Sequence, residues 1–180
     1  MFKILAFFIL AVALLSASLV MAEMPTGKIR VIDGDTLDVG GTRIRLYGID
    51  APEADQSCET AQGQSWACGA WVSREVRARY QGKTARCTAV DTDRYGRIVA
   101  RCSVGGQDMA AALVAEGLAF AYRRYAMDYD LIEKQAAAAD RGIWAMQMQN
   151  PAAYRQQQRA APAAPQQAAG DCTIKGNISA

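Results

Sequence analysis

The stretch KIRVIDGDTLDVGGTRIRLYGID, residues 28–50, decides the fold of this chain of 180 residues. Its apolar residues alternate with polar or charged ones, as in strands that bury one face. These apolar residues are Ile29, Val31, Leu37, Val39, Ile44 and Leu46. Gly34 and the pair Gly40-Gly41 interrupt the alternation, so the stretch predicts three strands in a meander.

The elements that follow alternate between helix and strand. An amphipathic helix is predicted from Gln62 to Tyr80, and a β-hairpin from residues 83–91 and 98–104. A short helix is predicted over 109–116, between a capping Asp108 and a closing Gly117, and a further helix over 128–140. Five strands with interspersed helices predict an α+β fold, a small closed β-barrel packed with about three α-helices, over residues 24–150.

The two ends of the chain differ in composition from the middle. Residues 1–22 hold one early charge at Lys3, an apolar run and small residues before Ala22, which is typical of a cleaved signal peptide. The apolar run is short against the roughly 20 residues of a spanning helix, so a retained anchor is less favoured. We therefore expect export to the periplasm or the medium, without stable membrane insertion after cleavage. Residues 151–180, rich in Ala, Gln and Pro, predict a disordered tail that ends in a short, truncated Cys-containing segment.

Five cysteines in an exported chain predict disulfides. Four of them lie in the domain, and sequence alone leaves three full pairings open. If the hairpin turns at Arg94-Tyr95 as a two-residue loop, Cys87 lies directly across from Cys102, where a disulfide can form. Cys58 and Cys68 then pair by default. Free buried thiols, the alternative, are less favoured outside the cytosol. Cys172 is left over and could pair between two copies of a chain that we otherwise expect to be a monomer.

The chain contains no histidine. Its absence excludes Ser-His-Asp and Cys-His catalysis and an imidazole metal site, so proton transfer falls to carboxylate, tyrosine or lysine. Between Glu23 and Asn150, sixteen Lys and Arg residues stand against seventeen Asp and Glu, a net charge of −1. Binding of a polyanion must therefore depend on a local cluster of arginines.

Two short acidic segments, Asp33-Gly34-Asp35 and Asp50-Ala51-Pro52-Glu53, lie on either side of Arg45. Carboxylates are hard oxygen ligands, so Asp35 and Asp50 predict a Ca²⁺ site that the Ala51 carbonyl and waters complete. Glu53, held three residues past Asp50 by the stiff Pro52, is the predicted base that takes a proton from water.

Arg45 and Arg97 are the predicted phosphate ligands, because a guanidinium can hold two phosphate oxygens and stays charged at any working pH. Each of these segments also has a purely structural interpretation. Asp-Gly-Asp could be a hairpin turn, Ala51-Pro52-Glu53 a loop before a helix, and Arg97 part of a surface hairpin tip. Their order and spacing together favour metal-assisted hydrolysis of a phosphodiester.

Three blocks of the chain carry a resemblance to a known family. They are Val31-Ile32-Asp33-Gly34-Asp35-Thr36, Arg45-Leu46-Tyr47-Gly48-Ile49-Asp50-Ala51-Pro52-Glu53 and Asp93-Arg94-Tyr95-Gly96-Arg97. In these blocks the chain resembles the thermonuclease, or staphylococcal nuclease-like, family, and the likeness covers nearly all of residues 27–150. The resemblance implies a five-stranded OB-fold barrel with helices packed on it. It also implies Ca²⁺-dependent cleavage of DNA and RNA by water, leaving a 3′-phosphate.

The resemblance also assigns roles to residues. It places Asp35 and Asp50 at the calcium carboxylates, Ala51 at a carbonyl ligand, Glu53 at the general base, and Arg45 and Arg97 at the phosphate-binding arginines. Ala51 stands where threonine is common in the family, a change that a carbonyl ligand tolerates.

Substrate contacts beyond the phosphate are predicted at two tyrosines. Tyr95 and Tyr122 could stack bases, which favours single strands, or could be partly buried barrel aromatics. The alternative function is a catalytically silent OB-fold module that binds nucleic acid or protein. Such modules typically lose metal carboxylates or arginines, whereas all five charged positions are present here.

Overall fold

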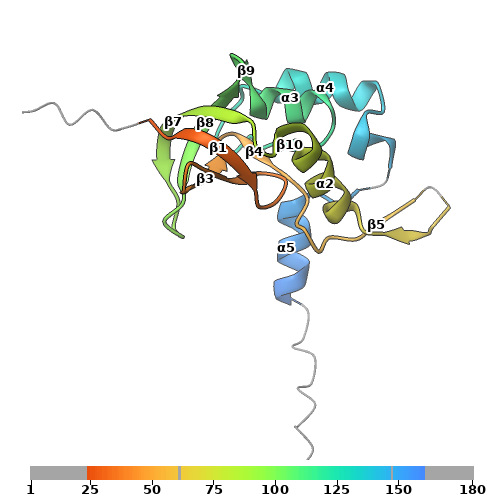
Figure 1. The fold of residues 1–180 in the computed structure, drawn as a ribbon. Coiled ribbons are helices and arrows are strands. Elements are labelled where there is room, and N and C mark those ends of the chain that lie inside the picture. Colours follow the sequence, from red (N-terminus) through yellow and green to blue (C-terminus); the bar gives the residue numbers. More distant parts are fainter. Residues whose placement is uncertain (1–23, 61, 147, 161–180) are drawn as a thin grey trace, which may run out of the picture.

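The structure, a computed structural model, describes residues 24–60, 62–146 and 148–160 (Figure 1). The expected signal peptide, and residues 161–180 of the expected tail with Cys172, lie outside the described residues. Within the described ranges, every helix is too short or too polar to cross a lipid bilayer.

Five strands close into the predicted barrel. They are β1 (Thr26–Val31), β2 (Thr36–Val39), β3 (Thr42–Leu46), β7 (Thr84–Thr92) and β8 (Ile98–Val104), in the order β3-β2-β1-β7-β8. The first three form the antiparallel meander that the alternation predicts. A parallel pairing of β3 with β8, in which Ile44 lies opposite Ile98, closes the barrel. The expected five-stranded OB-fold architecture is therefore confirmed.

The apolar face of each strand points into the barrel. The core of fully buried large side chains includes Ile29, Leu37, Val39, Ile44, Leu46, Val72, Met109, Leu113, Leu118 and Ile143. All six alternating apolar residues of the opening stretch belong to this core. The polar residues between them are thereby left at the barrel surface, where some form the functional site.

The hairpin of β7 and β8 differs from the predicted one in its turn. Its loop has three residues, Arg94 to Gly96, since the Asp93 N–H donates to the Arg97 carbonyl at 3.0 Å. A β-bulge at Val90, between Ala89 and Asp91, then shifts the register by one residue. The extra bulged residue on one strand compensates for the longer loop. As a result, Cys87 and Cys102 still lie opposite each other, as expected.

Both predicted disulfides are present. Cys87 lies opposite Cys102 in the hairpin and is bonded to it, and Cys58 is bonded to Cys68. The second disulfide joins the short strand β5 (Cys58–Glu59) to the start of the next helix. β5 pairs with another short strand, β6 (Ser65–Trp66). Because residues 62–67 belong to this small hairpin, the helix begins six residues later than predicted.

Helices cover the barrel at several points. They are α2 (Cys68–Tyr80), α3 (Met109–Ala115), α4 (Asp130–Ala138) and α5 (Pro151–Ala160), with a 3₁₀ turn η1 at Gly142–Ala145. α3 begins as predicted, because Asp108 Oδ1 accepts the Ala111 N–H at 3.1 Å. In Figure 1, α3 and α4 lie together, whereas α5 stands apart from them beside the loop before β5.

The helix α5 corrects the prediction that the tail is disordered from residue 151. Asn150 Oδ1 accepts the Ala152 N–H at 2.9 Å, and the buried Pro151 occupies the first helical position. Asparagine at the cap followed by proline is a helix-start signature. The prediction of disorder relied instead on the Ala- and Gln-rich composition of the segment.

Candidate active site

The two acidic segments form adjoining walls of one site. Asp35 lies in the tight loop between β1 and β2, where Asp33 Oδ1 accepts the N–H groups of Asp35 at 3.0 Å and Thr36 at 2.7 Å. The Asp-Gly-Asp segment is thus a hairpin turn, and the turn itself positions Asp35. Asp50 ends the short strand β4 (Ile49–Asp50), which pairs with β10 (Phe120–Ala121). The side chain of Asp50 is only 1 % exposed.

Arg45 joins these two carboxylates. It lies on β3 opposite Thr36, so its side chain emerges beside the Asp35 loop. Its Nη2 atom is 3.1 Å from Asp35 Oδ2 and 2.8 Å from Asp50 Oδ1. Both acids therefore hold the guanidinium through one nitrogen, Nη2, and the fork of a guanidinium has further N–H donors that can bind a phosphate.

Burial dominates the electrostatics of the pair. It raises the pKa of Asp35 to about 7, with Asp33 and Asp50 adding to the rise while Arg45 and the Ala51 N–H oppose it. Burial alone would lower the pKa of Arg45, but Asp35 and Asp50 together leave it raised. An added cation at this site would therefore favour the ionised form of Asp35.

Arg97 reaches the same site through a hydroxyl group. It precedes β8, the strand that pairs with β3, and its Nε donates to Asp93 Oδ2 at 2.7 Å. Its Nη1 donates to Thr36 Oγ1 at 3.2 Å, and that hydroxyl donates to Asp35 Oδ1 at 3.0 Å. The structure therefore brings both predicted arginines to Asp35, Arg45 directly and Arg97 through Thr36. Thr36, which sequence reasoning did not single out, connects them.

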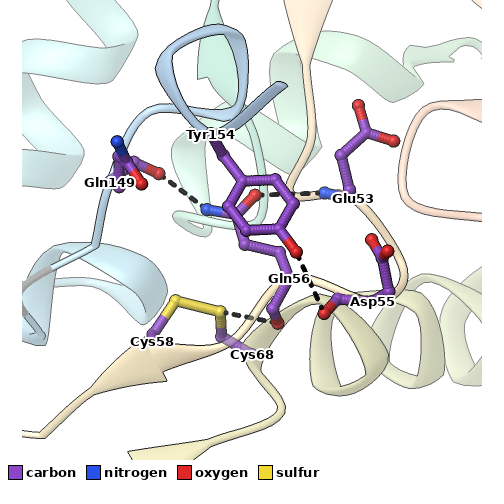
Figure 2. The surroundings of a disulfide bond; sticks show 7 residues. All are labelled: Glu53, Asp55, Gln56, Cys58, Cys68, Gln149 and Tyr154. Carbon is purple, nitrogen blue, oxygen red and sulfur yellow. Dashed lines mark hydrogen bonds between the residues drawn. A yellow bond between two sulfur atoms is a disulfide. The ribbon is translucent and has the colours of Figure 1, made fainter. Parts of the chain in front are cut away.

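Glu53 stands on a loop fixed from behind by Gln56 and Gly69. The fully buried Gln56 accepts the Glu53 N–H on its Oε1 at 3.2 Å and donates from Nε2 to the Gln149 carbonyl at 2.8 Å (Figure 2). Its own carbonyl accepts the Gly69 N–H at 3.0 Å, next to the Cys58–Cys68 disulfide. A Cβ on Gly69 would lie 1.6 Å from the Glu53 carbonyl oxygen, so only glycine permits this approach.

Arg155 of α5 also enters the site, where no sequence pattern predicted it. Its Nη2 lies 2.7 Å from Asp50 Oδ2, and its Nη1 donates to Asp50 Oδ1 at 3.1 Å and to Glu53 Oε1 at 2.5 Å. The hydrogen bonds to both acids hold the pKa of Arg155 above its usual value, although burial opposes them. The helix-start signature at Asn150-Pro151 could have revealed the helix, but not this contact.

The donor set fits a hard divalent cation. When all three are ionised, Asp35, Asp50 and Glu53 carry three negative charges against the one positive charge of Arg45, a net of −2 with Arg155 set aside. Among the described residues, no three His, Cys, Asp or Glu side chains gather closely enough to hold a metal by themselves. An ion at Asp35 and Asp50 would therefore need a backbone carbonyl and waters as well, which is usual for Ca²⁺.

The two predicted substrate tyrosines lie at the margin of the site. Tyr95 is 68 % exposed at the hairpin tip, with the Arg97 guanidinium 5.6 Å from its ring centroid. Tyr122 is half-buried after β10, and its N–H donates to the Gly48 carbonyl at 2.8 Å. Its ring lies 5.0 Å from that of Tyr125.

Comparison with known proteins agrees with this geometry. The profile of the family described as "Staphylococcal nuclease homologue" matches residues 43–146. The chain is 31% identical over 157 residues to the succinoglycan biosynthesis protein ExoI of Rhizobium meliloti, covering 82% of this chain and 78% of that protein. It is 32% identical over 130 residues to an uncharacterized endonuclease of Escherichia coli (68% and 78%). It is 31% identical over 151 residues to a micrococcal nuclease of Shigella flexneri (74% and 81%). The chain belongs to the staphylococcal nuclease homologue family.

Proposed function

We propose that this protein is an exported, Ca²⁺-dependent nuclease that hydrolyses DNA and RNA. Family membership makes the chain a phosphodiester hydrolase with nucleic acid as its substrate, in a family that uses metal ions. The identity of the metal, the compartment and the preferred form of the substrate are the parts that we add.

A single observation carries the proposal: Asp35 and Asp50 meet on one nitrogen of Arg45, with Glu53 three residues further along the chain. A silent binding module has no use for buried like charges, since they cost stability unless a ligand offsets them. The raised pKa of Asp35 marks such a cost.

Each residue then has a part in hydrolysis. Asp35, Asp50 and the Ala51 carbonyl would hold Ca²⁺, which neutralises phosphate charge and polarises the phosphorus centre when bound. Glu53 takes a proton from the attacking water. Arg45 and Arg97 donate to the phosphate oxygens as negative charge grows on them in the transition state.

Export is supported by the cysteines. Two disulfides inside one small domain are typical of an oxidising compartment and rare in the cytosol. The expected signal peptide at residues 1–22 provides the route. The rings of Tyr95 and Tyr122 would favour single-stranded substrate, because an unpaired base can lie flat on an aromatic ring.

The test is cleavage of single-stranded DNA, plasmid DNA and RNA by the oxidised protein, with Ca²⁺ or with chelator. Arg97→Ala is the site variant. Arg86→Ala, an exposed arginine on β7 that makes no ion pair within the described ranges, is the control of equal charge. We expect Ca²⁺-dependent cleavage that Arg97→Ala lacks and Arg86→Ala keeps. Binding without cleavage in every condition would support the silent OB-fold module instead.

A further inference from the structure

The helix α5 is attached to the body of the protein at its first turns only. Pro151 is buried, and the Tyr154 hydroxyl donates to the Asp55 carbonyl at 3.4 Å. Figure 2 shows Tyr154 beside the loop of residues 53–56, with Gln149 next to Gln56. From residue 156 onward the helix is exposed. Such a small apolar contact area permits the helix to detach and rebind without unfolding the barrel.

Among the described residues, the strongest contact of α5 is made by Arg155, and it covers the acids that the proposed reaction needs. Both oxygens of Asp50 accept from its guanidinium, and Glu53 accepts from the same Nη1 atom. The arginine side chain is 30 % exposed, whereas that of Asp50 is 1 % exposed. Arg155 therefore closes the site at its solvent side.

A guanidinium in this position and a divalent cation exclude each other. Ca²⁺ binds carboxylate oxygens at about 2.3–2.6 Å, in the space where Arg155 Nη2 lies 2.7 Å from Asp50 Oδ2. The two positive charges would also repel each other at that separation. With Arg155 in place the site carries three negative and two positive charges, and without it the net charge of −2 matches the charge of one Ca²⁺.

We propose that α5 is an autoinhibitory latch: Arg155 holds Asp50 and Glu53 in the metal-free protein, and Ca²⁺ binding releases the helix. The proposal rests on the proposed function, because it takes these acids as the Ca²⁺ site and the base. It assigns Arg155 no part in the chemical step. While the latch is closed, Arg155 holds both oxygens of Asp50, where a metal would bind, and the Oε1 atom of Glu53.

The latch predicts a measurable penalty on metal binding. The apparent dissociation constant of a ligand rises by the inverse of the fraction of protein in the binding-competent state. A latch that is closed about nine-tenths of the time therefore weakens Ca²⁺ binding about tenfold. Removing Arg155 removes this penalty, and at the same time it destabilises the metal-free protein by leaving Asp50 buried without its partner.

The first measurement is calorimetric titration of the oxidised protein with Ca²⁺ in the absence of nucleic acid. The variants are Arg155→Ala, Arg155→Lys and Arg159→Ala. Arg159 is one helical turn further along α5, is exposed, and makes no ion pair in the part of the chain that the structure describes. We expect about tenfold tighter binding for Arg155→Ala, an intermediate gain for Arg155→Lys, which keeps charge without the fork, and no change for Arg159→Ala.

The second measurement is hydrogen exchange of the amides in residues 151–160. We expect protection in chelator and its loss at saturating Ca²⁺ in the wild type, and fast exchange under both conditions in Arg155→Ala. Equal Ca²⁺ affinity of the wild type and Arg155→Ala, or protection of α5 that Ca²⁺ leaves unchanged, would overturn the latch. A failure of both proteins to bind Ca²⁺ would overturn it as well.

Cleavage rates separate this proposal from the proposed function. If cleavage depends on Ca²⁺ but the wild type and Arg155→Ala bind Ca²⁺ with equal affinity, the proposed nuclease activity is supported and the latch is wrong. Tighter Ca²⁺ binding by Arg155→Ala without any cleavage means that the latch stands and the activity is wrong. A loss of cleavage by Arg155→Ala at saturating Ca²⁺ would refute the latch, because it would give Arg155 a direct role in handling the substrate.

Discussion

Replacing Gly69 with alanine is expected to lower the turnover rate far more than the stability. Gly69 lies in the first turn of α2, against the loop that carries Glu53. The added Cβ would lie 1.6 Å from the Glu53 carbonyl oxygen, whereas ordinary contact begins at 3.4 Å. The backbone at Glu53 must therefore move by about 2 Å, or the start of the helix must move by as much.

The size of the effect follows from that displacement. A misplacement of about 1 Å in a catalytic group can cost about 100-fold in rate. Overpacking of this kind costs about 1–3 kcal/mol of unfolding free energy. We thus expect kcat to fall by at least about 100-fold at saturating Ca²⁺ and substrate, while the protein stays folded.

The assay compares initial cleavage rates and urea unfolding of Gly69→Ala with those of Gly82→Ala. Gly82 has a φ of +76° and open space around its Cβ position, so alanine there is strained without crowding a neighbour. It is expected to lose about 1–2 kcal/mol and to keep its kcat. Gly69→Ala with the turnover rate of the wild type would refute the idea that this close approach positions Glu53.

Four further predictions concern the acids, an arginine and a disulfide. Glu53→Gln should lower kcat by about 10²–10⁴-fold without unfolding the protein, as measured by initial rates and circular dichroism. In chelator, the wild type should lose stability as pH rises from about 4 to about 7, because the unfolded state loses the Asp35 proton at the ordinary pKa of 3.8 while folded Asp35 keeps it until about pH 7. Thermal unfolding of Asp35→Asn should lack this slope. Arg97→Lys should keep charge and lose most activity in the same rate assay, since lysine has no bidentate fork. Replacing Cys87 and Cys102 by alanine opens a loop of sequence separation 15 and should cost about 3 kcal/mol in urea unfolding.

The alternation of residues 28–50 was sufficient to predict the barrel meander, because a period of two sets which face of each strand is buried. The prediction of the hairpin turn was wrong, yet the pairing of Cys87 with Cys102 is confirmed. The bulge at Val90 compensates for the third loop residue. Bulges depend on the twist of the closed barrel, which a local sequence pattern does not record.

Local sequence patterns predict only part of the arrangement of the candidate site. Asp33, Gly34 and Asp35 form the expected turn, which by itself directs Asp35 inward. The contact between Asp35 and Arg45 instead requires the register of two strands, and the contacts of Gln56 require a loop, a helix and the chain before α5. Such tertiary contacts leave no periodic trace, so they could not be read in advance.

Charge balance links the acids, the metal and the helix α5. Buried carboxylates that outnumber their guanidinium partner can be stabilised by a proton, a divalent cation or a second arginine, and the site shows a route to each. Asp35 can take up a proton because its pKa is raised, the proposed Ca²⁺ is the divalent cation, and Arg155 is the second arginine. Only the cation leaves Arg45 and Glu53 available to a phosphate and a water. Protonation of Asp35 at low pH and closure by α5 should therefore both oppose Ca²⁺ binding.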